Sequence, residues 1–166
     1  MNDLLTPEVT AEDLFFLNRS IEIGEAVANN NLPIGAVVVL NGEIIAEGSN
    51  DYVFPIFNPD GHAEINALNK VDEELLFRCS KKMTLYTNVE PCLMCLGTII
   101  LYRIGRVVYG ATDPNRGACY LTDNLDKIYK KNQLPIIIGP VPQVQEKCSA
   151  MWERANVIYR KFRESE

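Results

Sequence analysis

The chain has 166 residues, of which 47% are hydrophobic, and its formal net charge is −6. This length suits one domain with a sizeable core, and we expect residues 1–166 to form a single domain. The acidic balance disfavours non-specific attraction to a phosphate backbone. The first ten residues carry two acidic and no basic side chains, and no apolar run is long enough to span a bilayer, so we expect a cytoplasmic protein without a membrane partner.

The first predicted element is a helix. Thr10 followed by Asp13 is typical of a helix start. A helical stripe of apolar side chains then predicts a helix to about Asn29, which Asn29–Pro33 breaks. The stripe consists of Leu14, Leu17, Ile21 and Val27.

A β-hairpin follows. Gly35–Leu40 and Glu43–Ser49 are typical of strands, and the Asn41-Gly42 pair between them favours a type I′ turn. Asn50 comes directly after the second strand, where its amide can present both a donor and an acceptor to a ring edge. The alternative for Asn50 is an ordinary loop cap.

The next segment predicts a loop that leads into a helix. Asp51–Gly61 contains two prolines and three aromatic residues and ends in a turn-like sequence, so we expect it to wall a pocket and to deliver His62 to a helix start.

The remaining elements alternate between strands and helices. In chain order we expect a helix at about His62–Leu68, a strand at Met83–Thr87, a helix at about Cys92–Tyr102, a strand at Arg106–Gly110, a loop at Ala111–Asn124, a short helix at Asp123–Asn132, a strand at Leu134–Gly139 and an amphipathic helix at Gln143–Arg163. Trp152 of the last helix is expected in the core. The pattern predicts an α/β protein, a three-layer α/β/α sandwich with a five-stranded mixed sheet.

Two short motifs carry the chemistry. His62 precedes Glu64 by two residues, and Pro91 opens a Cys92-x-x-Cys95 sequence. One imidazole and two thiolates are ligands of catalytic zinc sites, which keep a fourth position for water, and a carboxylate that is not a ligand can move protons. The motifs therefore predict a Zn²⁺ cofactor with His62, Cys92 and Cys95 as ligands and Glu64 as the catalytic residue.

Other interpretations of the cysteine pair fit less well. A structural zinc site needs a fourth ligand, and His62 is the only histidine in the chain. A thioredoxin-like redox pair would follow the first strand, whereas Cys92 lies more than halfway along the chain. Five cysteines without an export signal favour reduced thiols over a disulfide framework.

At these motifs the sequence resembles the cytidine deaminase superfamily, in the branch of guanine deaminases, fungal cytosine deaminases and tRNA adenosine deaminases. The resemblance runs from about Pro33 to Ala118. It implies the same fold, a substrate ring held by Asn50, a substrate amine that meets the backbone carbonyl of Glu90, and a homodimer that pairs through the ligand-bearing helices. The side chain of Glu90 is expected to be structural.

The sequence thus predicts a zinc-dependent hydrolase that converts the amino group of a small nucleobase, such as guanine or cytosine, to a carbonyl and releases ammonia. Glu64 transfers the protons, and the backbone N–H groups of Ala63 and Cys92 are donors in the site. Specificity is expected from residues 51–61 and 111–124.

Two alternatives stay open. The first is a deaminase of wobble adenosine in tRNA, which needs a basic surface such as Arg154, Arg160, Lys161 and Arg163. Against it, Cys119-Tyr120-Leu121 replaces the small residues expected in tRNA enzymes. The second is an inactive, zinc-stabilised binding module, which the presence of Glu64 and of an open ligand position disfavours.

Overall fold

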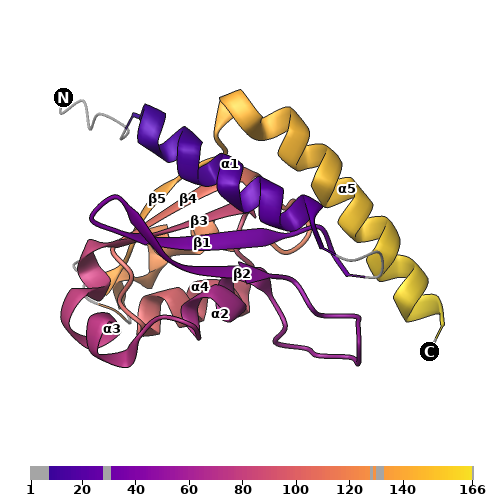
Figure 1. Ribbon diagram of the computed structural model, residues 1–166, viewed down its shortest axis with the longest axis horizontal. Helices are drawn as coiled ribbons and strands as arrows, with labels where there is room; N and C mark the ends of the chain where they lie inside the picture. Colours follow the sequence, from indigo (N-terminus) through magenta and orange to yellow (C-terminus); the bar gives the residue numbers. More distant parts are fainter. Residues whose placement is uncertain (1–7, 28–30, 128, 130–132, 166) are drawn as a thin grey trace.

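The computed structural model describes residues 8–27, 31–127, 129 and 133–165, and its centre is a mixed five-stranded sheet (Figure 1). The strands are β1 Gly35–Leu40, β2 Glu43–Ser49, β3 Met83–Val89, β4 Arg106–Ala111 and β5 Ile136–Ile138, in the order β2-β1-β3-β4-β5. β1 runs antiparallel to β2 and β3, and β4 runs parallel to β3 and β5. This confirms the predicted sheet.

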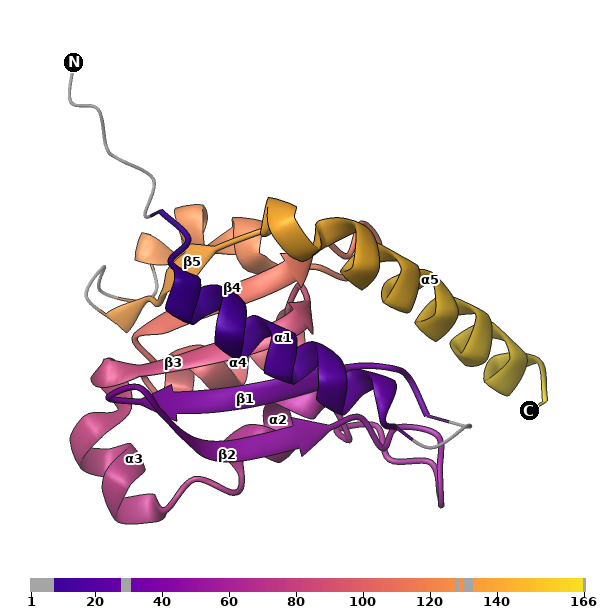
Figure 2. The same cartoon turned by 45° about the horizontal axis from the view of Figure 1, so that its top comes forward.

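Helices cover both faces of the sheet. α1 Ala11–Glu25 and α5 Pro142–Glu164 lie on one face, and α2 Ala63–Leu68 and α4 Leu93–Leu101 lie on the other (Figure 1, Figure 2). The structure is therefore the expected three-layer α/β/α sandwich. None of the helices in the described ranges is long and apolar enough to cross a membrane.

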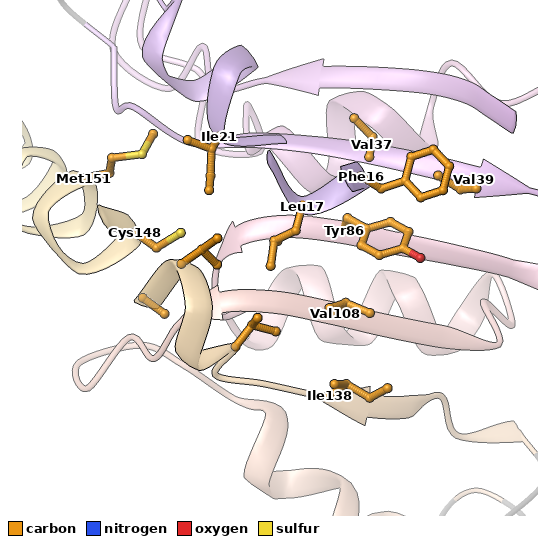
Figure 3. Close-up of a cluster of buried hydrophobic side chains, with 13 residues drawn as sticks. Phe16, Leu17, Ile21, Val37, Val39, Tyr86, Val108, Ile138, Cys148 and Met151 are labelled. Atoms are coloured by element: carbon orange, nitrogen blue, oxygen red, sulfur yellow. The ribbon is translucent and has the colours of Figure 1, made fainter. Parts of the chain in front are cut away.

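The side chains of β1 point alternately into two hydrophobic clusters, one on each face of the sheet. Val37 and Val39 face α1 and α5, in the cluster shown in Figure 3, whereas Ala36, Val38 and Leu40 face α2 and α4. All six residues of β1 are buried, as expected for a strand covered on both sides.

The hairpin between β1 and β2 is as predicted. Asn41 and Gly42 both have positive φ, 54° and 79°, which is the conformation of a type I′ turn, and the turn closes on the pair Leu40–Glu43. Asn tolerates this region better than most residues, and Gly has no Cβ to clash.

The predicted start of α1 is confirmed in detail. Thr10 Oγ1 accepts a hydrogen bond from the Asp13 backbone N–H at 3.1 Å, and the Asp13 carboxylate accepts one from the Thr10 N–H at 2.9 Å. The helix ends at Glu25 rather than near Asn29. Residues 29 and 30 of the predicted break lie outside the described residues.

Four expectations need correction. α3 Glu73–Cys79 and the 3₁₀ turn η1 Ser80–Lys82 were not predicted, because α3 is short and none of its residues is fully buried. The expected loop 111–124 is interrupted by the 3₁₀ segment η2 Cys119–Lys127. The helix expected at 123–132 is found only as the end of η2, and residues 128 and 130–132 lie outside the described residues. β5 is shorter than the expected Leu134–Gly139.

Trp152 is a fifth correction. It is half-buried, and the buried stripe of α5 is Val144, Cys148, Met151 and Ala155. Trp152 lies beside this stripe, so the helix contributes smaller side chains to the core than its composition suggested.

Candidate active site

Two helix N-termini bring the predicted ligands together. His62 follows the 51–61 loop as the N-cap of α2, and Cys92 follows β3 as the N-cap of α4, with Cys95 in the first turn. His62 Nδ1 lies 3.5 Å from the Sγ atoms of both Cys92 and Cys95, and all three ligand atoms lie within 4.8 Å of one another.

This geometry suits a metal ion. Tetrahedral zinc, with Zn–S of about 2.3 Å and Zn–N of about 2.0 Å, separates its nitrogen and sulfur ligands by roughly 3.5 Å. His62 and the two thiols match that separation without rearrangement. One nitrogen and two sulfurs leave one tetrahedral position, so the group could hold an ion with an open site.

The thiol pair is prepared for a cation. The hydrogen bond between the Cys92 and Cys95 thiols lowers the pKa of Cys92 to about 4, and a hydrogen bond with His62 lowers it further. The same contact with Cys92, together with burial, raises the pKa of Cys95. The pair therefore holds one thiolate at neutral pH before any cation binds, and a cation would favour the second.

Glu64 lies in the first turn of α2 and is buried. Burial raises the pKa of its carboxyl group to about 7, although His62 opposes the shift. A carboxyl group with this pKa can both take and give a proton near neutral pH.

A cavity of about 130 Å³ opens beside these residues. Its walls come from the segment before β1, the loop after β2, the end of β3, the starts of α2 and α4, the 111–118 segment and α5. The lining residues are Leu32, Ile34, Asn50, Tyr52, His62, Glu64, Val89, Glu90, Cys92, Asp113, Arg116 and Tyr159.

Asn50 lines the cavity, but its contacts correct one expectation. Its Oδ1 atom accepts hydrogen bonds from the backbone N–H groups of Leu32, at 3.3 Å, and Tyr52, at 3.1 Å. Both acceptor positions are thus used to hold the loops, and Asn50 can offer a substrate only its Nδ2 donor instead of the expected donor and acceptor.

Glu90 has the expected structural side chain. Its Oε1 atom accepts a hydrogen bond from the Cys119 N–H at 3.0 Å, and Oε2 accepts one from the Asp113 N–H at 3.3 Å. Glu90 therefore holds both ends of the segment that forms one cavity wall. Ala63 is the buried first residue of α2, and it does not line the cavity.

An aromatic cluster covers the cavity. The ring of Tyr52 lies 5.9 Å from His62, 5.8 Å from Tyr159, 5.2 Å from Phe57 and 6.2 Å from Phe162. These contacts join the 51–61 loop to the end of α5, which extends beyond the sheet (Figure 1, Figure 2). The expectation that this loop walls the pocket is confirmed.

Asp113, Arg116 and Tyr159 are among the lining residues that sequence reasoning did not single out. Asp113 and Arg116 lie in a segment that was expected to touch substrate, but no pattern distinguished them from their neighbours. Tyr159 lies 97 positions after His62 on a helix that was interpreted by its periodicity alone, so only tertiary packing could place it in the site.

Comparisons with known proteins agree with this geometry. A tRNA-specific adenosine deaminase of Bacillus subtilis (strain 168) is 32% identical over 143 residues, which are 86% of this chain and 87% of that protein. A guanine deaminase of the same strain is 35% identical over 132 residues, 78% of this chain and 83% of that protein. A solved structure from a study of A-to-I editing by tRNA:A34 deaminases at the wobble position of tRNA has a TM-score of 0.65 and 30% identity, and covers 77% of this chain and 98% of its own.

Fold and site together define a deaminase with the cytidine deaminase-like fold, a hydrolase that acts on C–N bonds. The family model of the MafB19-like deaminases matches residues 11–135, and the chain belongs to that family. The resemblance seen in the sequence is confirmed.

Proposed function

We propose that this protein is a zinc-dependent deaminase of a free amino-bearing nucleobase. The observation that carries the proposal is the covered cavity beside the His/Cys group. Its volume of about 130 Å³ is close to that of the roughly 150 Å³ protein cavity known to hold benzene, and below the range of about 300–1,000 Å³ typical of drug-sized ligands. A space of this size suits a base better than a base with its sugar.

His62, Cys92 and Cys95 would hold the zinc ion, as their convergence supports. When bound there, zinc would polarise a water molecule and bring its pKa toward neutrality. We expect about one Zn²⁺ per purified chain by elemental analysis, and its loss in Cys92→Ser. Zinc-free protein with full activity would refute this assignment.

Glu64 is the proposed proton carrier. It takes a proton from the attacking water and gives it to the ring nitrogen. It then takes the second proton from the hydroxyl group now on the ring carbon and gives it to the departing amine, so that ammonia leaves and a carbonyl remains. Its position two residues after His62 and its pKa of about 7 support this role.

Three further groups would hold the base. The Nδ2 donor of Asn50 would contact the ring, and the Glu90 carbonyl would accept a hydrogen bond from the amino group. The backbone N–H of Ala63 has no partner within the helix, because it lies at the helix start, and it would donate to the substrate. Asn50 and Glu90 line the cavity, which supports their part.

Wobble adenosine in tRNA is the second candidate substrate. The similarity to a tRNA-specific adenosine deaminase favours it, as does a group of exposed basic residues at the end of α5, near the aromatic cover. The group consists of Arg160, Lys161 and Arg163. Against it, a nucleotide needs more room than a cavity of about 130 Å³ offers.

Ammonia release from a panel of substrates tests the proposal. The panel holds guanine, cytosine, adenine, their nucleosides and a tRNA anticodon stem-loop, and Glu64→Gln serves as the inactive control. We expect a free base to be the best substrate. Turnover of the stem-loop with none of the bases would decide for the tRNA alternative.

A homodimer is also proposed, through the outer face of α4. Leu93 and Leu101 on this face are 66% and 68% exposed, and a Cβ at Gly97 between them would meet no atom within 4 Å. Spaced at i, i+4 and i+8, these residues form one flat apolar stripe. Light scattering should give twice the 18.7 kDa of the chain. Leu101→Glu should give a monomer, while Val157→Glu on α5 should stay dimeric, and a monomeric wild type would refute the proposal.

A further inference from the structure

Arg116 is the one lysine or arginine among the residues that line the described cavity. Its side chain is exposed, so it lies at the open side of the cavity, whereas Glu64 lies at the closed side. Its guanidinium carbon lies 4.1 Å from the centroid of the Tyr159 ring. Such stacking holds the planar guanidinium flat and leaves its N–H edges free to donate.

The backbone next to Arg116 is hydrogen-bonded to the segment that contains Pro91 and Cys92. Asp113 Oδ1 accepts from the Arg116 N–H at 3.1 Å, and the neighbouring Gly117 pairs with Cys92 in an isolated β-bridge. The Ala118 N–H donates to the Pro91 carbonyl at 3.0 Å. These contacts fix the position of residue 116 relative to the His/Cys group.

Within the part of the chain that the structure describes, Arg116 forms no ion pair. Among the described residues, no carboxylate lies within 4.0 Å of its guanidinium nitrogens. The oxygens of Glu90 that face this segment accept backbone N–H groups instead. A fixed fork of donors at a cavity mouth, without a carboxylate partner among the described residues, is suited to two adjacent acceptors on a ligand.

We propose that Arg116 is a specificity-determining residue that binds two adjacent acceptors on the substrate edge opposite the reacting amino group, and that the substrate is therefore a 2-amino-6-oxopurine, guanine. This inference rests on the proposed function. The carbon that carries the amino group must approach His62, Cys92 and Cys95, so the opposite edge of the base points to the open side, where Arg116 lies.

The three amino-bases differ at that edge. In guanine the edge opposite C2 carries O6 and N7, two acceptors that arginine binds in a bidentate manner. In cytosine the edge opposite C4 carries N1–H beside O2, and in adenine the edge opposite C6 carries N3 beside N9–H. Each of these two offers one acceptor and one donor, and arginine has no acceptor to pair with the donor.

The test compares guanine with 2-aminopurine, which has the same reacting amino group but lacks O6. We would measure kcat/KM for both bases, or the inhibition constant of 2-aminopurine against guanine if it is not turned over, in wild type, Arg116→Met, Arg116→Lys and Arg154→Met. Arg154→Met is the matched control, because it removes the same charge from an exposed position of α5 that does not line the cavity. The ratio of the two values does not depend on how much of each variant is folded.

Wild type should prefer guanine by on the order of 10-fold to 100-fold, and Arg116→Met should remove that preference while Arg154→Met keeps it. Arg116→Lys should keep only part of it, since an ammonium cannot bind both acceptors with a planar fork. An unchanged ratio in Arg116→Met refutes the inference. A preference for GMP over guanine that Arg116→Met abolishes also refutes it, because the residue would then bind phosphate. A wild type inactive on every free base overturns the proposed function instead.

Discussion

Glu64 combines a buried position with the proposed role of proton carrier. Glu64 lies in the first turn of α2, and its side chain lines the cavity. Burial raises the pKa of the carboxyl group to about 7, and a group that titrates near the working pH is an efficient proton carrier.

The first prediction concerns this carboxylate. Glu64→Gln keeps the shape of the side chain and is no ligand in the His/Cys group, so zinc content and melting temperature should stay close to wild type. Because the amide cannot carry a proton, kcat should fall by about 10²–10⁴-fold or more. Steady-state kinetics with elemental analysis checks this, and Glu153→Gln, an exposed residue of α5, is the control. Residual activity within a few-fold of wild type would remove Glu64 from the mechanism.

Asn50 holds two loop N–H groups and is proposed to contact the base, and two variants separate these roles. Asn50→Asp keeps the Oδ1 atom that accepts from Leu32 and Tyr52 but removes the Nδ2 donor, so kcat/KM should fall by more than stability does. Asn50→Ala removes both and should also lower the free energy of unfolding by about 1–3 kcal/mol, because two N–H groups lose their partner. Kinetics and urea denaturation of both variants are the measurements. Equal activity in Asn50→Asp and wild type would leave Asn50 only its loop-capping duty.

At the scale of elements, α1 is fastened to the sheet through one residue of its first turn. Asp13 caps the helix and also accepts hydrogen bonds from Arg106 Nη2, at 2.8 Å, and from the Tyr86 hydroxyl, at 2.8 Å. Burial raises the pKa of Asp13, but the bonds from Arg106, Thr10 and Tyr86 outweigh burial and hold it well below the usual 3.8. The same contact links α1 with β3 and β4.

Asp13→Asn should therefore lower the free energy of unfolding at pH 7 by about 2–4 kcal/mol, less than a fully buried pair because Arg106 is partly exposed. A depressed carboxyl pKa contributes stability above pH 3.8 that is lost as the pH falls below it, so the difference between wild type and variant should shrink in acid. Urea denaturation between pH 7 and pH 3 measures both, with the exposed neighbour Glu12→Gln as control. A constant difference across this range would contradict the linkage.

Aromatic contacts connect the end of α5 to Tyr52, which lines the cavity. Phe162 lies 6.2 Å from Tyr52 and 5.6 Å from Phe57, measured between ring centroids, and does not line the cavity itself. Because aromatic pairs contribute about 0.5–1.5 kcal/mol each, Phe162→Ala should raise KM for the base by about 3- to 10-fold with a smaller change in kcat. Phe15→Ala, an exposed aromatic of α1, should leave both constants unchanged. A KM that stays at the wild-type value would show that the cover does not contribute to binding.

At the scale of the whole molecule, charge separates the two candidate substrates. The chain has 22 acidic and 16 basic residues, and its basic group at the end of α5 is small. Turnover of a free base should be nearly independent of salt. An enzyme that binds single-stranded RNA loses about 0.7 log units of affinity per log unit of salt for each phosphate contact. We would measure kcat/KM from low to moderately high salt on the best substrate, and a steep decline would favour the tRNA alternative.

Local patterns sufficed for much of this architecture. The hairpin turn at Asn41-Gly42, the capped start of α1 and the strands β3 and β4 all depend on neighbours in the chain, and each was predicted to within a few residues. α3 was missed because its residues form no buried stripe, and the 3₁₀ segment η2 was missed because such turns have no period of their own.

The sequence by itself was enough to predict the chemistry of the site, since the residue types and spacing of His62, Glu64, Cys92 and Cys95 are short-range properties that only a few kinds of site require. Tertiary structure alone decided what surrounds them. Arg116 and Tyr159 line the cavity from a loop and a helix that come late in the chain. The Oδ1 atom of Asn50 accepts hydrogen bonds from backbone N–H groups that no sequence pattern connects to it. The reason is physical: metal ligation depends on a few atoms of defined type, whereas the shape and polarity of a pocket depend on contacts between segments whose separation in sequence carries no signal.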